Sequence, residues 1–167
     1  MEWIFLPIDG SVNRDQFDCG IPELNEYLKK YARQNHRKGI AKTFVAISDE
    51  NQRNVVGYYS VSMSEIKRES MPKDYQKKLP RYPIPAIRIV KLGVDLSMQG
   101  RGLGKEILMQ GLRRAVSLSS EVGIFAVAVD AINEQAKQFY LKYGFLPLEG
   151  EAFSLFIPIS TVKEVID

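Results

Sequence analysis

The chain carries the glycine-rich stretch Gln99-Gly100-Arg101-Gly102-Leu103-Gly104, which lies between a β-branched segment ending near Asp95 and an amphipathic segment. Glycines let the backbone turn tightly here and bring its N–H groups close to a ligand. The N-terminus of the helix that follows adds unpaired N–H groups and a partial positive charge. The stretch therefore predicts a pyrophosphate-binding loop, and Arg101 adds a direct charge contact to it.

Other interpretations of this loop are a Walker A motif, a dinucleotide fingerprint and a turn without a ligand. Walker A requires Gly-Lys-Ser/Thr, whereas Lys105 is followed here by Glu106. The dinucleotide fingerprint requires a third glycine where Lys105 stands, although Asp130 ends the next predicted strand, where a ribose-binding acid would lie. Only about 60 residues follow the loop, too few for a doubly wound dinucleotide domain. A ligand-free glycine turn remains open.

Composition indicates an ordinary globular protein. The chain has 167 residues, of which 45% are hydrophobic and 26% charged, so we expect a single domain over residues 1–167. The lone Cys19 cannot form an internal disulfide, which fits a reducing cytosol. A run of about 18 apolar residues, which a membrane span requires, does not occur. We therefore expect a cytoplasmic protein without membrane contact, and the net charge of +3 permits an acidic partner without requiring one.

Hydrophobic periodicity predicts a meander of strands followed by alternating helices and strands. Strands are expected over residues 3–8, 43–47, 55–63, 87–94, 123–129, 145–148 and 153–159. Helices are expected from Pro22 onward, over 72–78, over 104–117 and over a last segment that Gly144 terminates as a C-terminal cap. This order is typical of an α/β or α+β layered domain.

The helix that begins at Pro22 combines an apolar face with a basic one. Leu24, Tyr27, Leu28 and Tyr31 recur at helical spacing and predict a buried face. Positive charge gathers on the same helix at Lys29, Lys30, Arg33, Arg37 and Lys38, and Arg81, Arg88, Lys91 and Arg101 extend it elsewhere in the sequence. Such charge gives salt-sensitive, largely sequence-blind contacts to nucleic-acid phosphates. A solvated helix face balanced by nearby glutamates is the alternative, and charge alone favours it.

Three motifs together resemble the GNAT superfamily of N-acetyltransferases. The acetyl-CoA motif Gln-x-x-Gly-x-Gly is matched by Gln99, Gly102 and Gly104. Leu92-Gly93-Val94-Asp95 resembles the central strand of that family, and Phe139-Tyr140-Leu141-Lys142-Tyr143-Gly144-Phe145 resembles its later helix-to-strand signature. The resemblance implies a GNAT fold, with a mixed sheet of about six or seven strands and about four helices. It also implies acetyl-CoA as co-substrate and no metal.

The resemblance assigns roles to particular residues. It implies that the pantetheine arm pairs like an extra strand with the backbone of Leu92 and Val94, and that the Val94 N–H faces the thioester oxygen as an oxyanion donor. Tyr140 matches the family's general acid, which protonates the leaving thiolate. The cofactor-binding set that the resemblance implies is Leu92, Val94, Gln99, Gly100, Arg101, Gly102, Leu103, Gly104 and Asn133.

A narrower resemblance points to the bacterial GNAT toxins of toxin–antitoxin modules. Its motifs are Phe17-Asp18-Cys19-Gly20, Gly57-Tyr58-Tyr59-Ser60 and Leu79-Pro80-Arg81-Tyr82-Pro83-Ile84-Pro85. The resemblance implies acetylation of aminoacyl-tRNA, a ribbon-helix-helix antitoxin, operator DNA bound only through that complex, and a homodimer. The tRNA contacts that it favours are Lys29, Lys30, Arg33, Arg37, Arg88 and Lys91. Such toxins often carry arginine where Lys91 stands, and lysine lacks the bidentate fork for a phosphate.

The sequence shows no obvious general base. His36 is the only histidine and lies in the basic helix, where we interpret it as solvated or close to phosphate. A lysine amine, with a pKa of about 10.4, needs a base, whereas an α-amino group near 8 is largely neutral already. The residues therefore favour an α-amine substrate. Alternatives are a GNAT enzyme acting on a small or protein amine, and a catalytically silent GNAT-fold binding module. Cys19 is interpreted as a packing residue.

Overall fold

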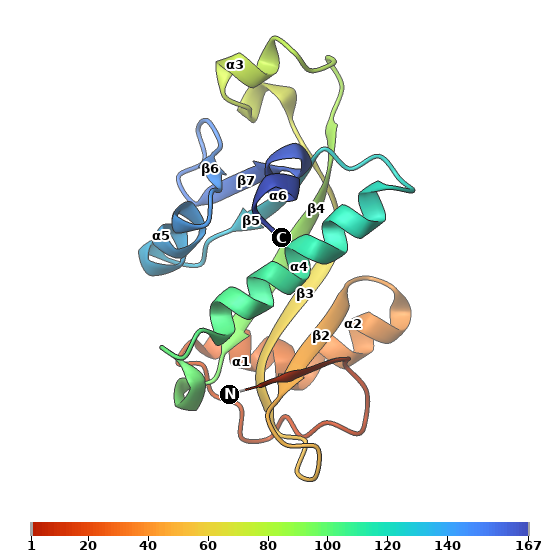
Figure 1. Cartoon of the computed structure of the whole chain (residues 1–167), viewed down its shortest axis with the longest axis vertical. Helices are drawn as coiled ribbons and strands as arrows, with labels where there is room; N and C mark the ends of the chain where they lie inside the picture. The colour runs from red at the N-terminus through yellow and green to blue at the C-terminus, as the bar shows by residue number, and fades with distance from the viewer. Residues whose placement is uncertain (1, 167) are drawn as a thin grey trace. The chain divides into compact units, whose positions relative to one another are not determined.

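A computed structural model describes residues 2–166 and contains a seven-stranded sheet in the order β1-β2-β3-β4-β5-β7-β6 (Figure 1). The strands are β1 (Ile4–Pro7), β2 (Lys42–Ile47), β3 (Val55–Ile66), β4 (Ile84–Val94), β5 (Ala126–Asp130), β6 (Leu146–Pro147) and β7 (Ser154–Pro158). The helices are α1 (Pro22–Glu26), α2 (Ala32–Lys38), α3 (Lys73–Gln76), α4 (Leu103–Ser119), α5 (Glu134–Lys142) and α6 (Ile159–Val165). The mixed sheet predicted from the sequence is confirmed.

The chain forms two compact units, which are described separately. The first unit comprises the chain up to Ser62 together with Val90–Gly111, and the second comprises Met63–Ile89 and the chain from Leu112 onward. No helix within residues 2–166 is long and apolar enough to cross a membrane.

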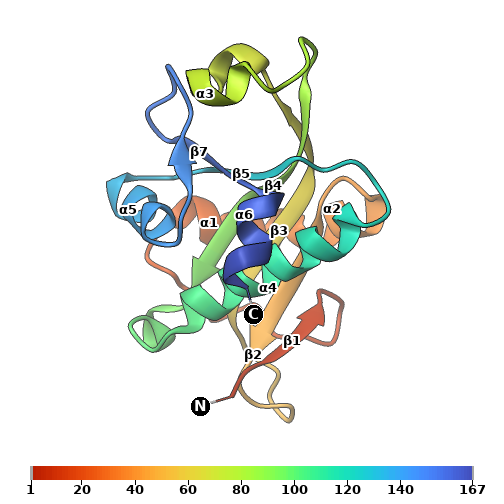
Figure 2. The same cartoon turned by 45° about the horizontal axis from the view of Figure 1, so that its top comes forward.

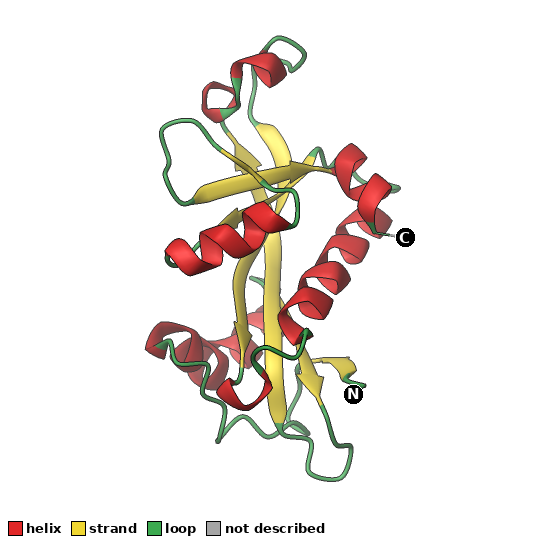
Figure 3. Ribbon diagram, turned by 60° about the vertical axis from the view of Figure 1, so that its left-hand side comes forward, coloured by secondary structure: helices red, strands yellow, loops and turns green. Residues whose placement is uncertain are grey.

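The first unit contains an antiparallel meander with a helix on each face. β1 pairs with β2, which pairs with β3 in a register that sets Val45 opposite Tyr58 (Figure 2). The Tyr58 hydroxyl donates a hydrogen bond to the Leu24 carbonyl of α1 at 2.7 Å. The preceding residue, Gly57, faces α4, because a Cβ there would lie 2.7 Å from Ile107 Cδ1. Since neighbouring strand residues point to opposite faces, α1 and α4 cover opposite sides of these strands (Figure 3).

The helix predicted from Pro22 is confirmed, but its buried face differs from the predicted one. A π-helical turn over Tyr27–Tyr31 joins α1 to α2. Such a turn contains one residue more than an α-helical turn. As a result Leu24, Leu28 and Ala32 are buried, whereas Tyr31 is 47% exposed. The uniform helical spacing used for the prediction was therefore wrong at Tyr31.

The second unit contains a parallel pair of strands. β4 and β5 run parallel from the pair Ala86 and Ala126 to the pair Ile89 and Val129, and β7 pairs antiparallel with β5. Gly144, with φ +97°, follows α5 and confirms the predicted cap. Helix α6 was not predicted. It begins at Ile159, directly after Pro158, and of its residues only Ile159 lay within the strand predicted over 153–159.

We expect Gly57→Ala to destabilise the protein by about 1–3 kcal/mol, because the new methyl group would overpack the buried contact with Ile107. Urea denaturation monitored by circular dichroism measures this change. Gly123→Ala is the matched control, since a Cβ at Gly123 meets no atom within 4 Å. Equal stabilities of the two variants would contradict the packing of β3 against α4.

Candidate functional site

The predicted phosphate loop joins β4 to α4 and has the geometry that the glycines suggested. Gly100 and Gly102 have φ values of +77° and +88°, which L side chains rarely adopt. A Cβ at either glycine meets no protein atom within 4 Å, so the space beside the loop is open. Helix α4 begins at Leu103, and its first N–H groups lack partners within the helix. The loop therefore fits a pyrophosphate.

The side chain of Gln99 anchors the loop to the rest of the first unit. Its Nε2 donates hydrogen bonds to the carbonyls of Val94 at 2.9 Å and Cys19 at 3.1 Å. The amide donors are therefore used within the protein, and its Oε1 and backbone remain for a ligand. The predicted contact between Gln99 and a cofactor stays a prediction.

The segment Phe17-Asp18-Cys19-Gly20 packs directly against the end of β4. Asp95 Oδ1 accepts a hydrogen bond from the Asp18 N–H at 2.9 Å, and the Leu96 N–H donates to the Asp18 carbonyl at 2.8 Å. Hydrogen bonds from the Gly20 N–H and the Asn25 amide hold the pKa of Asp18 below its ordinary value. One polar network thus joins the loop after β4 to the start of α1.

The backbone of β4 presents a free edge close to this loop. The Asp95 N–H donates to the Val56 carbonyl of β3 at 2.8 Å. Because alternate residues of a strand direct their hydrogen-bonding groups to opposite edges, Val94 and Leu92 face the edge away from β3. The register between β4 and β5 ends at Ile89, before either residue. Both N–H groups are therefore placed to pair with an extended ligand.

Cys19 lies close to this strand although 74 residues separate it from Gly93 in the sequence. The Cys19 Sγ is 3.6 Å from the position that a Cβ on Gly93 would take. The thiol is buried and contacts the Ile21 carbonyl, and its burial raises the pKa of the thiol. These contacts support the interpretation of Cys19 as a packing residue.

Tyr140 and Asn133 belong to the second unit, on and before α5. Tyr140 is 7% exposed and packs edge-on against Phe139 and Phe145. Burial raises the pKa of its phenol above the ordinary value, so the hydroxyl keeps its proton at neutral pH. The Asn133 Oδ1 caps α5 by accepting the Ala136 N–H at 2.8 Å, which leaves its Nδ2 donors for a ligand.

The basic residues predicted to contact tRNA fall into two groups. Lys29, Lys30 and Arg37 are exposed on the helical segment of the first unit. Arg33 is half-buried, and its guanidinium covers Gly10, where a Cβ would lie 2.9 Å from Nη2. The sequence analysis did not foresee this contact, because it joins the helix to a loop more than 20 residues earlier.

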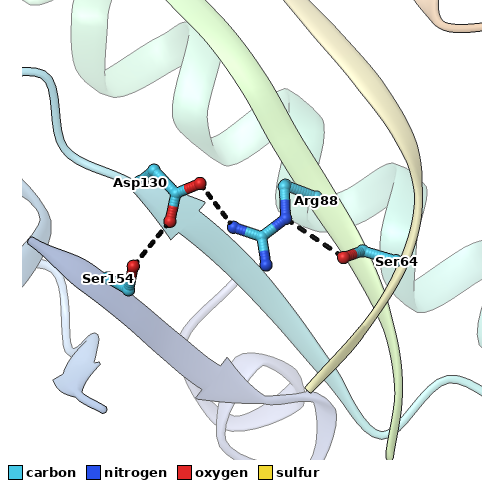
Figure 4. A network of polar contacts seen from close by, with 4 residues as sticks. All are labelled: Ser64, Arg88, Asp130 and Ser154. Carbon is cyan, nitrogen blue, oxygen red and sulfur yellow. Dashed lines mark hydrogen bonds and ion pairs between the residues drawn. The ribbon is translucent and has the colours of Figure 1, made fainter. Parts of the chain in front are cut away.

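Arg88 and Lys91 are paired with carboxylates. In the second unit, Arg88 Nη1 lies 2.8 Å from Asp130 Oδ2, and its Nε donates to the Ser64 hydroxyl at 3.1 Å (Figure 4). Ser154 donates to the other Asp130 oxygen at 2.7 Å, so the network crosses four neighbouring strands. In the first unit, Lys91 Nζ lies 3.3 Å from Glu23 Oε1. Their predicted phosphate contacts stay predictions, but each cation already has a partner.

His36 is a structural residue rather than a solvated one. Its Nδ1 accepts the Thr43 N–H at 2.9 Å, and its ring packs edge-on against Phe44. Burial, followed by the charge of Lys42, lowers the pKa of the imidazole. No cluster of three or more His, Cys, Asp or Glu side chains that could hold a metal occurs within residues 2–166.

Comparison with protein families and curated proteins gives consistent matches. Residues 11–145 match the model of the acetyltransferase (GNAT) family. A "tRNA-acetylating toxin" of Mycobacterium tuberculosis is 33% identical over 129 residues, which cover 77% of this chain and 75% of that protein. A "probable toxin TacT" of Sinorhizobium fredii is 26% identical over 172 residues, covering 98% of this chain and 94% of that protein.

Solved structures resemble this chain over nearly its whole length. A mutant of KacT gives a TM-score of 0.94 at 31% identity and covers 99% of both chains. AtaT complexed with acetyl-methionyl-tRNAfMet gives 0.92 at 31% identity, covering 99% of this chain and 100% of AtaT. An AtaT mutant toxin bound to the C-terminus of the antitoxin AtaR and acetyl-CoA gives 0.84 at 26% identity, covering 98% of this chain and 97% of that chain.

We expect His36 to make the protein less stable in mild acid. The folded-state pKa of His36 lies below its ordinary value of 6.5, so the unfolded chain binds this proton more readily. The neutral imidazole of His36 makes its full contribution to the free energy of unfolding above pH 6.5. This contribution is lost as the pH falls through the folded-state pKa.

Thermal unfolding between pH 8 and 5.5 measures the effect, with His36→Gln as the comparison. The carboxyl groups of Asp9 and Asp18 have lowered pKa values and contribute only in stronger acid. An equally steep loss of stability in His36→Gln would exclude the imidazole as its source.

Proposed function

The chain belongs to the acetyltransferase (GNAT) family, and from this premise we propose that it is a toxin that acetylates the α-amino group of aminoacyl-tRNA and thereby inhibits translation. The observation that carries the proposal is its likeness, over 99% of its length, to AtaT in complex with acetyl-methionyl-tRNA. The similarity to a tRNA-acetylating toxin of Mycobacterium tuberculosis supports it independently of the fold.

The residues of the first unit fit acetyl-CoA as the acetyl donor. The loop 99–104 leaves open space beside Gly100 and Gly102, and the first N–H groups of α4 add donors for a pyrophosphate. Exposed Arg101 supplies a positive charge, and the free edge at Leu92 and Val94 supplies backbone groups for the pantetheine arm. In the second unit, we assign the Nδ2 of Asn133 to the same arm. Acetyl-CoA supplies the activated acetyl group as a thioester.

Two groups of the chain would lower the barrier to acetyl transfer. We assign the Val94 N–H as the donor that stabilises negative charge on the thioester oxygen, a role typically worth about 3 kcal/mol. We assign Tyr140 as the acid because it occupies the position of the family's acid and its Oη is protonated at neutral pH, although burial raises its pKa and so makes the phenol a weaker acid. General-acid catalysis of this kind is usually worth about 100- to 10,000-fold.

The state of the amine follows from the absence of a histidine base. His36, the only histidine in the sequence, accepts the Thr43 N–H and packs against Phe44. An amine that reaches the site already neutral needs no base, and an α-amino group with a pKa near 8 meets this condition better than a lysine near 10.4. The chemistry thus favours an aminoacyl ester over a protein lysine.

The exposed charges of the helical segment are the ones best suited to tRNA. Within residues 2–166, no ion pair to a carboxylate involves Lys29, Lys30 or Arg37. We assign to them the phosphate contacts, which should make the affinity for tRNA fall steeply with salt.

We also propose a cytoplasmic location, a homodimer, and a ribbon-helix-helix antitoxin. Operator DNA is bound only through the complex with that antitoxin.

Tyr140→Phe is expected to lower the transfer of labelled acetyl from acetyl-CoA to charged total tRNA by about 100- to 10,000-fold. Binding of acetyl-CoA, measured by calorimetry, should be unchanged, since the ring is kept. Uncharged tRNA is the control and should take up no label.

The same assay distinguishes the alternatives. Label on small amines or protein termini but not on charged tRNA would favour a GNAT enzyme with another acceptor. Binding of acetyl-CoA without turnover on any amine would favour a silent binding module and contradict the proposal.

Gly102→Trp is expected to lower the affinity for acetyl-CoA at least tenfold, because the indole would fill the open space beside the loop. Gly150→Trp is the matched control: Gly150 also has a positive φ, +75°, and open surroundings, but lies in the loop between β6 and β7. The two substitutions impose similar backbone strain, so unchanged affinity in Gly102→Trp would contradict the assignment of the loop.

A further inference from the structure

The first unit contains a pocket that the proposed chemistry does not use. It has a volume of about 320 Å³ and is lined by Glu23, Glu26, Tyr27, Tyr31 and Lys91. Four of these residues come from α1 and the π-helical turn, and Lys91 comes from β4. None belongs to the loop 99–104 or to the Leu92 and Val94 edge, so the pocket is separate from the groups assigned to acetyl-CoA.

The charges of the lining favour a cationic ligand. The pocket holds two carboxylates and one ammonium group. Lys91 Nζ lies 3.3 Å from Glu23 Oε1 and is thereby neutralised. Glu26 is exposed, and no ion pair to it occurs within residues 2–166. The net charge of the lining is negative, which disfavours a phosphate and favours an ammonium or guanidinium group.

The aromatic side chains favour the same ligand. Tyr31 is 47% exposed and offers a ring face, and the ring of Tyr27 already has the Lys91 ammonium 5.5 Å from its centroid. Cations bind over such rings with useful free energy when partly desolvated. The ring of Tyr27 is thus already taken by a cation of the protein, and the exposed ring of Tyr31, near the exposed carboxylate of Glu26, is suited to the cationic end of a lysine or arginine side chain.

The hydroxyl of Tyr27 is buried behind the lining of the pocket. The Tyr27 Oη is inaccessible to solvent and has no hydrogen-bond partner among the described residues. An unpaired buried polar group destabilises a folded protein, and such groups are rare in native structures. Because solvent does not reach this oxygen, a ligand in the pocket does not contact it, and the hydroxyl can be removed without changing the lining.

The position of Lys91 connects the pocket with the acceptor substrate. Lys91 precedes Leu92 on β4 and lies three residues before Val94, a span of roughly 10 Å in an extended strand. The strand that we assign to the pantetheine arm therefore also forms one wall of the pocket. A group attached to the reacting amine is the ligand that this arrangement favours.

We propose that this pocket is an acceptor subsite that binds the cationic side chain of the amino acid carried by the tRNA, either a lysyl ammonium or an arginyl guanidinium. The inference rests on the proposed function, because it concerns the acceptor of the same acetyl transfer. Through this subsite the enzyme would prefer tRNAs that carry an amino acid with a positively charged side chain.

The test uses one tRNA body charged in turn with lysine, norleucine and glutamate. Norleucine matches the lysine side chain in length but lacks its charge. We expect kcat/KM for acetylation to be about tenfold higher for the lysyl form than for the norleucyl form, and lowest for the glutamyl form. Glu26→Gln should remove most of the preference for lysine, whereas Glu121→Gln, an exposed glutamate between α4 and β5, should retain it.

Tyr27→Phe separates a role in binding from a role in folding. Because the hydroxyl is unpartnered in the free protein, its removal should leave the thermal unfolding midpoint equal or higher. The same variant should keep its affinity for lysine methyl ester, followed through amide shifts of residues 23–31 in NMR spectra with norleucine methyl ester as the control, whereas Tyr31→Leu should lose it. Unchanged ester binding in Tyr31→Leu would overturn the assignment of the exposed ring.

The outcomes distinguish failure of this inference from failure of the proposed function. If none of the three charged tRNAs is acetylated, the proposed function itself fails. If all three are acetylated at equal rates in the unsubstituted protein, the side-chain subsite is overturned while the function stands. A further outcome is that lysine methyl ester changes the amide shifts of residues 23–31 while kcat/KM is the same for all three charged tRNAs. In that case the pocket binds a cation from another source, such as a protein partner, and the acceptor assignment is overturned.

Discussion

The carboxylate of Asp95 is the constraint on which the first unit depends. One oxygen accepts the Asp18 N–H at 2.9 Å and the other accepts the Ser97 N–H at 3.0 Å, so the carboxylate holds both the turn before α1 and the loop after β4. Gln99 adds a second connection by donating to the Val94 and Cys19 carbonyls. The same network therefore fixes the loop 99–104 and the start of the helix that lines the acidic pocket.

The pairing of the cations divides the basic residues into two groups. Asp130 and Glu23 engage Arg88 and Lys91, whereas the helical segment leaves Lys29, Lys30 and Arg37 exposed to solvent. A paired cation attracts phosphate less strongly, because its partner cancels much of its field. The exposed lysines and arginine are therefore the better candidates for the polyanionic body of a tRNA. The pocket beside β4, lined by Glu23, Glu26 and Lys91, has a net negative charge and is less suited to a phosphate.

Residues with strong local backbone preferences predicted most helices and strands. The sequence did not predict contacts between residues far apart in the chain. The glycines of the loop, Pro22 at the start of α1 and Gly144 after α5 each act on their own backbone, so their effects could be predicted from neighbouring residues alone. The hydrogen bond from Gln99 to Cys19 joins residues 80 positions apart, and the ion pair of Lys91 with Glu23 joins residues 68 apart. Helical or strand periodicity relates residues only a few positions apart, so it cannot predict either contact. Tyr31 was misplaced because no residue type announces the π-helical turn that exposes it.

The ion pair of Lys91 has a consequence for an enzyme whose structure offers no histidine base. Negative charge close to an amine favours its protonated form, which cannot attack a thioester. Of the two carboxylates of the pocket, that of Glu23 is offset by Lys91, whose ammonium lies 3.3 Å from Glu23 Oε1 and which precedes Leu92 on β4. Arginine at this position would supply the same charge but would direct it through a planar, bidentate group suited to a phosphate. From β4, Lys91 therefore holds a point charge against Glu23, without the planar fork that a bidentate phosphate contact requires.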